Sequence, residues 1–104
     1  MPAQQHRWED DERLAQRYAR DPAGEAHALE TLFRRHIEAT YAFARRFLST
    51  REDAEEAAGE CWLRVFRALR AGSYRGESRF KTWLLGIAHN VCRERVRQPR
   101  LPTL

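Results

Sequence analysis

Apolar residues recur every three or four positions through most of this chain, which is the spacing of one face of an α-helix. The longest stripe consists of Leu29, Leu32, Phe33, Ile37, Tyr41, Ala44, Phe47 and Leu48. Asp21 and Pro22 precede it, and they are residues favoured at the N-cap and at the first helical position. We therefore predict a long helix from residue 22 to about residue 48.

A second stripe predicts a second long helix. It consists of Ala54, Ala57, Ala58, Cys61, Trp62, Val65, Phe66 and Leu69. Its start is marked by a capping box from Ser49 to Glu52, or by a shifted one from Thr50 to Asp53. This helix should run from about residue 52 to residue 71.

A third stripe follows a loop at residues 72–77, where two glycines interrupt the helical spacing. It consists of Phe80, Trp83, Leu84, Ile87, Ala88, Val91 and Val96, all expected on the buried side. Ser78 is the predicted N-cap of this last helix. Pro99 and Pro102 prevent its continuation, so it should end near residue 97.

A shorter helix should lead the chain. Four acidic residues at positions 9–12 precede Leu14 and Tyr18, and acids are favourable at the positive end of a helix dipole. This helix should end near Arg20. No segment has the alternation of a strand, so the predicted fold class is all-α, a bundle of three main helices plus the short N-terminal one. The expected organisation is a flexible N-terminus at 1–8, one helical domain at 9–97 and the start of a linker or tail at 98–104.

The length of 104 residues agrees with a single domain. No apolar run approaches the roughly 18 residues of a membrane span, and the first thirty residues lack the apolar core of a signal peptide. Two cysteines do not form the disulfide framework of a secreted protein. We therefore expect a cytoplasmic protein that does not contact a membrane.

Charge is unevenly distributed along the chain. Residues 1–60 hold 9 Arg and 13 Asp or Glu, a balance of −4, whereas residues 61–104 hold 9 Arg and Lys81 against Glu77 and Glu94, a balance of +8. A basic half attracts phosphate and an acidic half repels it. The pattern predicts a polyanion at the C-terminal half and a different partner at the N-terminal half; a solvated, salt-bridged surface without partners is the alternative.

The sequence contains none of the common motifs of enzyme active sites that we considered. The sequence has no glycine-rich phosphate loop, no HExxH pair and no Ser/His/Asp set in a recognisable context, so we expect neither catalysis nor a cofactor. A zinc site is an alternative that four residues could supply. They are His36, Cys61, His89 and Cys92. The two cysteines lie on apolar stripes, where cysteine is more often a small buried residue, so we expect no metal.

Aromatic and basic residues alternate from the loop into the last helix. They are Tyr74, Arg75, Arg79, Phe80, Lys81 and Trp83. Aromatic rings stack on unpaired bases while Arg and Lys hold phosphates. We expect Trp83 in the core and Tyr74 exposed in its loop. Asn90, one turn beyond Ile87, carries an amide that can pair with a base edge.

Four segments, at residues 33–36, 53–56, 62–69 and 74–90, resemble region 2 of bacterial RNA polymerase sigma factors of the extracytoplasmic-function (ECF) type. The most specific of these matches is the pattern of Arg79, Phe80, Thr82, Trp83, Leu84, Ile87, Ala88 and Asn90. The resemblance covers about residues 12–97. It implies a helical bundle that serves transcription initiation, with core RNA polymerase and the single-stranded non-template strand of the promoter −10 element as partners. An anti-sigma factor is a further partner that it leaves open.

The resemblance also implies roles for individual residues. The helix at 52–71 would dock on the clamp helices of the polymerase β′ subunit, with candidate contacts at Asp53, Glu56, Glu60 and Arg64. The segment at 73–97 would hold the melted DNA, with a flipped base among Tyr74, Ile87 and Asn90. The complete set of candidate DNA contacts is Tyr74, Arg75, Arg79, Lys81, Ile87, Asn90, Arg93 and Arg97.

The sequence departs from the family pattern at Gly59, where the family often has the glutamine used in docking. The two residues before it, Ala57 and Ala58, are smaller than the usual apolar side chains, so we expect the core packing there to be thinner or to be filled by Trp62. The resemblance ends where the family has a linker to a domain that reads the −35 element. Two other functions stay open, a helix-turn-helix protein that binds duplex DNA through Arg93, Arg95 and Arg97, and a helical protein-interaction module.

Overall fold

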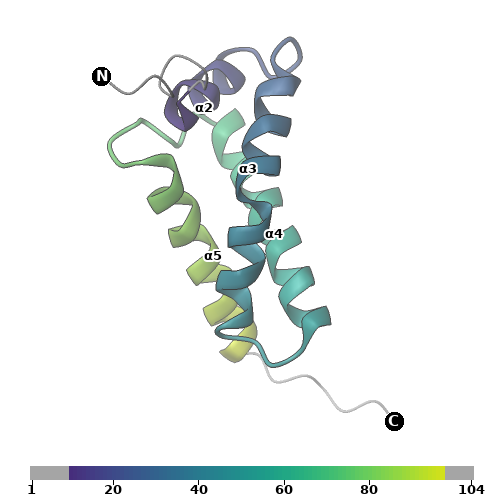
Figure 1. Cartoon of the computed structure of the whole chain (residues 1–104). Helices are drawn as coiled ribbons and strands as arrows, with labels where there is room; N and C mark the ends of the chain where they lie inside the picture. The colour runs from purple at the N-terminus through teal and green to yellow at the C-terminus, as the bar shows by residue number, and fades with distance from the viewer. Residues whose placement is uncertain (1–9, 98–104) are drawn as a thin grey trace, which may run out of the picture.

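The computed structural model describes residues 10–97, and four helices account for their architecture. They are α2 (Asp11–Arg20), α3 (Ala26–Arg45), α4 (Arg51–Arg70) and α5 (Phe80–Arg97). The three long helices lie side by side, and α2 packs across one end of them (Figure 1). No strand occurs within residues 10–97. The prediction of an all-α bundle with one short leading helix is confirmed; the N-terminus at 1–8 and the tail at 98–104 lie outside the described residues.

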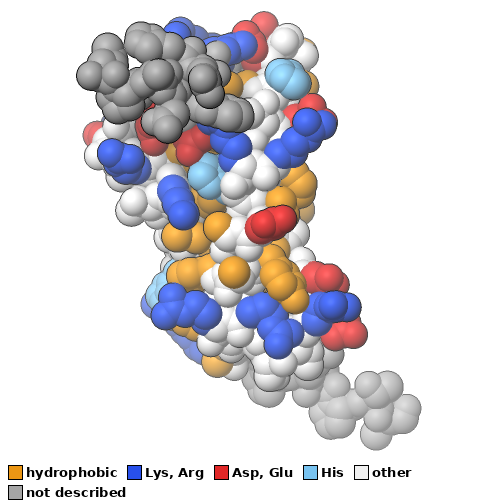
Figure 2. Space-filling view, viewed as in Figure 1, with side chains coloured by type: hydrophobic (Ala, Val, Ile, Leu, Met, Phe, Trp, Pro, Cys, Tyr) orange, Lys and Arg blue, Asp and Glu red, His pale blue; other side chains and the backbone are white. Residues whose placement is uncertain are grey.

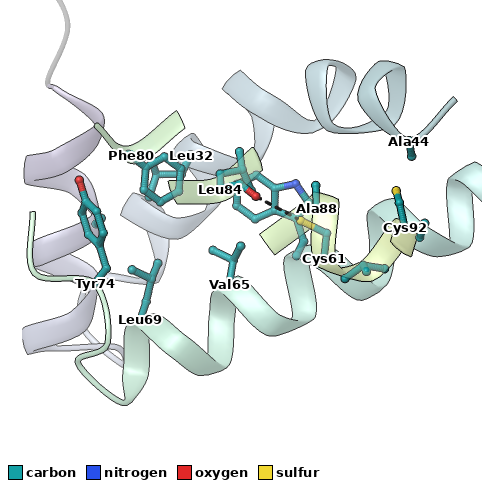
Figure 3. Close-up of a cluster of buried hydrophobic side chains, with 14 of the residues drawn as sticks. Leu32, Ala44, Cys61, Val65, Leu69, Tyr74, Phe80, Leu84, Ala88 and Cys92 are labelled. Carbon is teal, nitrogen blue, oxygen red and sulfur yellow. Dashed lines mark hydrogen bonds between the residues drawn. The ribbon is translucent and has the colours of Figure 1, made fainter. Parts of the chain in front are cut away.

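The core fills the space between the three long helices. Its largest fully buried side chains come from all of them, with Leu32 from α3, Val65 and Leu69 from α4, and Phe80 and Leu84 from α5. In Figure 3 these side chains form one continuous cluster. No helix within residues 10–97 combines the length and the apolar character needed to cross a membrane.

The predicted start of the long helix at Asp21 and Pro22 is wrong, because Asp21 ends α2 and closes a separate turn. Its Oδ1 accepts a hydrogen bond from the Gly24 amide at 3.1 Å, and its carbonyl accepts one from the Glu25 amide at 2.8 Å. A Cβ atom on Gly24 would collide with the Asp21 carboxylate, so a larger residue there would have to displace that side chain. The helix therefore begins at Ala26, and it ends at Arg45 rather than near Leu48.

The starts of the other two long helices differ in kind. Thr50 is the N-cap of α4, and its hydroxyl accepts from the Asp53 amide at 3.1 Å, so the shifted capping option is confirmed. The prediction that Ser78 caps α5 is wrong. The Phe80 amide instead donates to Glu12 Oε2 at 2.7 Å. A carboxylate from α2 therefore accepts a hydrogen bond from one of the amides that have no partner within the first turn of α5.

Several residues predicted on buried faces are less buried than expected. Val96 is 60% exposed and Phe47 is 42% exposed. Trp83, expected in the core, and Ile87 are half-buried and pack against the core from its edge. For the α5 residues the reason is geometric, because the apolar stripe on α5 is wider than the strip of that helix which α3 and α4 cover. Phe47 lies beyond the end of α3 at Arg45.

Candidate functional site

The four residues predicted to bind a partner through α4 recur at the spacing of one helix face, and Glu56, Glu60 and Arg64 take part in ion pairs. Arg64 donates to Glu60 at 3.1 Å and to both carboxylate oxygens of Glu94 at 3.0 and 2.6 Å. Glu56 accepts from Arg95 at 3.1 Å. Asp53 is half-buried in the first turn. The structure therefore brings Glu60 and Arg64 together and connects α4 to α5 through both Arg64 and Glu56.

These ion pairs shape the charge of the α4–α5 seam more than the stability of the fold. Hydrogen bonds from Glu94 and Glu60 raise the pKa of the Arg64 guanidinium, and the bond from Arg64 lowers the pKa of Glu94. The paired side chains are between a third and three fifths exposed, and ion pairs this exposed contribute little to stability. Glu56 and Glu60 are therefore oriented by their partners while still partly exposed to solvent.

The side of α4 that faces α3 forms an apolar groove with that helix, which sequence reasoning missed. Two adjoining cavities of about 520 and 440 Å³ share Phe33 and Gly59. Their lining residues are Ala26, Leu29, Glu30, Phe33, Ile37, Glu38 and Tyr41 of α3, and Glu55, Ala58, Gly59, Trp62, Leu63 and Phe66 of α4. The available signal was the four-residue spacing of Leu29, Phe33, Ile37 and Tyr41, a second apolar line beside the core stripe.

Small residues on α4 keep this groove open. A Cβ atom on Gly59 would meet nothing within 4 Å, so the glycine contributes open space rather than close packing. Of the two alternatives expected here, the structure shows Trp62 filling the core: it is 6% exposed, and its Nε1 donates to Thr40 Oγ1 at 3.1 Å. Phe33 and Leu63 are 41% and 42% exposed in the groove. Its acidic rim consists of Glu30, Glu38 and Glu55.

The prediction that Tyr74 is exposed in its loop is wrong. Tyr74 is 7% exposed, and its ring centroid lies 4.9 Å from that of Trp83 and 5.9 Å from that of Phe80. Its hydroxyl donates to the Ser78 carbonyl at 2.6 Å, which closes the loop. Figure 3 places Tyr74 at one end of the core cluster. The ring supports the base of α5 and is not available to stack on a base in this conformation.

The α5 candidates divide into exposed and half-buried groups. Asn90, Arg93 and Arg97 are exposed on one face, together with Gly86, at positions that a helix brings into line. Ile87 is half-buried at the edge of that face. The structure thus provides a polar and basic strip along α5, with an amide in its middle.

The basic residues at the start of α5 are not alone there. Arg79 and Lys81 line a cavity of about 470 Å³ with Arg35 and with three acids of the α2 segment. The acids are Asp10, Asp11 and Glu12. The separation of charge along the sequence is therefore not reproduced in space at this end of the molecule; Arg75, in the loop, is exposed.

Asp11 connects α2 to α3. Its carboxylate accepts from His36 Nε2 at 2.6 Å and from Arg35 at 2.9 Å. Burial raises the pKa of Asp11, but the hydrogen bonds from His36 and Arg35 outweigh it, so the pKa is lowered overall. The charged form of Asp11 therefore helps to hold α2 across the end of the bundle.

The four residues weighed as a zinc site do not come together. His36 bonds to Asp11, and His89 packs against Phe47. Burial raises the pKa of the Cys61 thiol to about 12, and the thiol donates to the Leu84 carbonyl. No group of three or more His, Cys, Asp or Glu side chains suited to a metal ion occurs within residues 10–97.

Comparisons with known proteins point to one family. The family described as Sigma-70 region 2 matches residues 32–100. The ECF RNA polymerase sigma factor SigM of Mycobacterium tuberculosis is 36% identical over 78 residues, which cover 75% of this chain and 39% of that protein. The RNA polymerase sigma-H factor of Pseudomonas aeruginosa is 32% identical over 85 residues, covering 82% of this chain and 42% of that protein.

A third relative is the ECF RNA polymerase sigma factor BldN of Streptomyces coelicolor, 28% identical over 91 residues, which cover 88% of this chain and 34% of that protein. The chain spans about two fifths of the length of SigM and of the sigma-H factor. No solved structure matches the chain with comparable significance.

Proposed function

The chain belongs to the sigma-70 region 2 family and is of the ECF type, and on that premise we propose that it binds rather than catalyses, docking on core RNA polymerase through α4 and holding the melted −10 element through α5. The observation that carries the proposal is the exposed line of Asn90, Arg93 and Arg97 on α5, the helix to which the resemblance assigns the DNA. The two activities use different helices and can be tested separately.

Docking on the clamp helices of the β′ subunit is supported by the face of α4 between the α5 seam and the groove. Glu56 and Glu60 remain partly open to solvent, and Leu63 adds an exposed apolar side chain one turn further on. Apolar area at the centre of an interface with charges around it is the usual composition of a docking surface. Gly59, in place of the family's glutamine, leaves the groove beside these acids open to an apolar side chain of the partner.

The test of docking is a pull-down of a β′ clamp-helix fragment by Glu56→Arg with Glu60→Arg. We expect loss of binding while the circular-dichroism spectrum stays helical. Because this variant also removes ion pairs with Arg64 and Arg95, Arg95→Ala is the matched control, since it breaks the Glu56 pair and leaves the α4 acids in place. Retained binding by the double variant, or equal loss in the control, would contradict the assignment of these acids to the polymerase.

Binding of the unpaired non-template strand is supported by the chemistry of the α5 strip. Guanidinium groups at 93 and 97 can pair with phosphates, and the Asn90 amide can reach the base-pairing edge of a base only if the base has left the stack. A helix-turn-helix reader of duplex DNA is less well supported, because residues 71–79 form a long loop between α4 and α5 instead of a tight turn.

The test of DNA binding is fluorescence anisotropy with a labelled −10 non-template strand and the matched duplex, over a salt series. We expect tighter binding of the single strand. Arg93→Ala should lower the salt slope by about 0.7 for each phosphate that the variant no longer neutralises on a single strand. Asn90→Ala should leave that slope unchanged and flatten the preference for one base. Equal affinity for single strand and duplex would contradict the proposal.

A further inference from the structure

The exposed large hydrophobic side chains within residues 10–97 fall into two separate pairs. Phe33 and Leu63 line the α3–α4 groove. Phe47 and Val96 belong to the C-terminal ends of the α3 segment and of α5, and Phe47 contacts α5 through His89. The groove is part of the surface proposed above for docking on the polymerase, whereas the proposed docking and DNA contacts leave Phe47 unused.

Phe47 is held in place by two neighbouring rings that leave it partly uncovered. Its centroid lies 5.1 Å from that of Phe43, one turn earlier, and 5.6 Å from that of His89 on α5, with the His89 ring nearly perpendicular at 75°. Phe47 is nevertheless 42% exposed. A ring that is fixed at its edges and open on the remaining surface is already ordered for stacking, which reduces the entropy lost on binding.

The charge around Phe47 is basic. Arg45 and Arg46 precede it, Arg93 follows His89 by one turn, and all three are exposed. The acid nearest to Arg93 along α5, Glu94, is already paired with Arg64. Figure 2 shows Lys and Arg side chains at the lower end of the molecule, where α3 and α5 end, with Asp and Glu side chains beside those at the right. These surroundings favour a polyanion and disfavour a basic or purely apolar partner.

We propose that Phe47, seated on Phe43 and His89, is a platform on which one unpaired base of a single-stranded nucleic acid stacks, with Arg46 and Arg93 holding the adjoining phosphates. The proposal rests on the proposed single-strand binding and adds a base contact directly after α3, away from the loop. It assigns to Phe47 the stacking role that the buried ring of Tyr74 does not fill. Stacking on an open ring is tolerant of sequence, because every base has a flat face.

The experiment uses the sequence tolerance of stacking. A labelled oligothymidylate and an abasic strand with the same number of phosphates are titrated by anisotropy at low salt against the parent chain and three variants. Phe47→Ala should weaken oligothymidylate binding about fivefold or more without changing the salt slope, and should leave binding of the abasic strand unchanged. Phe47→Trp should retain or tighten binding. Phe33→Ala, which truncates a phenylalanine that is 41% exposed in the groove, is the matched control and should bind DNA like the parent.

The outcomes separate the platform from the function on which it rests. Equal affinities of Phe47→Ala and Phe33→Ala for oligothymidylate would overturn the platform, and so would equal weakening of Phe47→Ala on the abasic strand or on a duplex. If the parent still prefers single strands and Asn90→Ala still flattens base preference, the proposed function stands without the platform. A parent chain that does not prefer single strands would overturn both. Thermal melts of each variant show whether a loss of binding is a loss of folding.

Discussion

Phe33 and Phe47 are two phenylalanines of nearly equal exposure that have opposite surroundings. Phe33 lies within α3 and Phe47 two residues after its end, and they are 41% and 42% exposed. Phe33 lies in an apolar groove rimmed by acids, with Trp62 edge-on at 5.4 Å, whereas Phe47 lies among arginines with His89 edge-on at 5.6 Å. Exposure alone therefore does not indicate the kind of partner; the side chains that line the surface around each ring do.

The two sides also differ in how they are built. The α3–α4 side stays open because Ala58 and Gly59 are small and Trp62 turns into the core. The side that carries α5 is closed by ring packing from Tyr74 through Trp83 and Phe80, and by the Glu12 carboxylate at the start of the helix. The acidic side therefore offers a groove, and the basic side offers an exposed helix surface.

The largest effect should come from Tyr74→Ala, which removes the ring that packs against Phe80 and Trp83 at the start of α5. Because Tyr74 is buried and bonded to the Ser78 carbonyl, the free energy of unfolding should fall by about 3 kcal/mol or more, measured by urea denaturation. Tyr74→Phe is the control, and the loss of one hydrogen bond should cost about 1 kcal/mol. A loss below about 0.5 kcal/mol in Tyr74→Ala would be typical of a surface residue. It would contradict the burial of the ring and support the exposed position predicted from the glycine-flanked loop.

The second largest effect should come from Asp11→Asn, which weakens the hydrogen bonds that join α2 to α3. Two charge-assisted hydrogen bonds are altered, so the free energy of unfolding at pH 7 should fall by about 2 kcal/mol. The folded pKa of Asp11 is lowered from its usual 3.8, so its contribution is complete above that pH and is lost as the pH falls through the lowered value. The stability gap between parent and variant should close in acid; a gap independent of pH would contradict this account.

A smaller effect should come from Ile87→Ala at the edge of the basic strip. Ile87 is half-buried, so the free energy of unfolding should fall by only about 1–2 kcal/mol, less than a fully buried position loses. Leu84→Ala, at a fully buried position on the same helix, is the matched comparison and should cost about 2–5 kcal/mol. Equal losses in denaturant melts would show that α5 is rotated toward the core relative to this structure.

The smallest effects on stability should come from a matched pair, Gly59→Ala and Gly86→Ala. Both glycines lie within helices, and at both a Cβ atom would meet nothing within 4 Å. Each variant should therefore be more stable by about 0.5–1 kcal/mol. Binding should separate them: Gly59→Ala should weaken capture of the β′ fragment alone, and Gly86→Ala should weaken single-strand binding alone. Identical binding profiles for the two variants would contradict the assignment of protein docking to the α3–α4 side and of single-strand binding to the α5 side.

Much of the fold was predictable because it depends on local signals. The helical spacing on α3, α4 and α5 predicted the bundle, and the Thr50 cap was one of the two options predicted for the start of α4, since these features depend on neighbours within four residues. The errors at Tyr74 and at the start of α5 occurred where residues from other elements intervene. The Glu12 carboxylate accepts the hydrogen bond from the first amide of α5, although the two residues are 68 positions apart in the sequence. The residues around Ser78 therefore could not have predicted this contact.

The candidate site shows the same division. The amino-acid sequence was enough to establish which residues carry charge or aromatic rings, which helices hold them, and the resemblance that the family match confirms. The packing of the helices decided that Tyr74 is buried, that Glu56 and Arg64 pair with α5, and that Phe33 and Phe47 have different surroundings. The physical reason is that helical periodicity fixes the direction of a side chain around its own axis, whereas exposure and local charge depend on how the neighbouring helices pack against that axis.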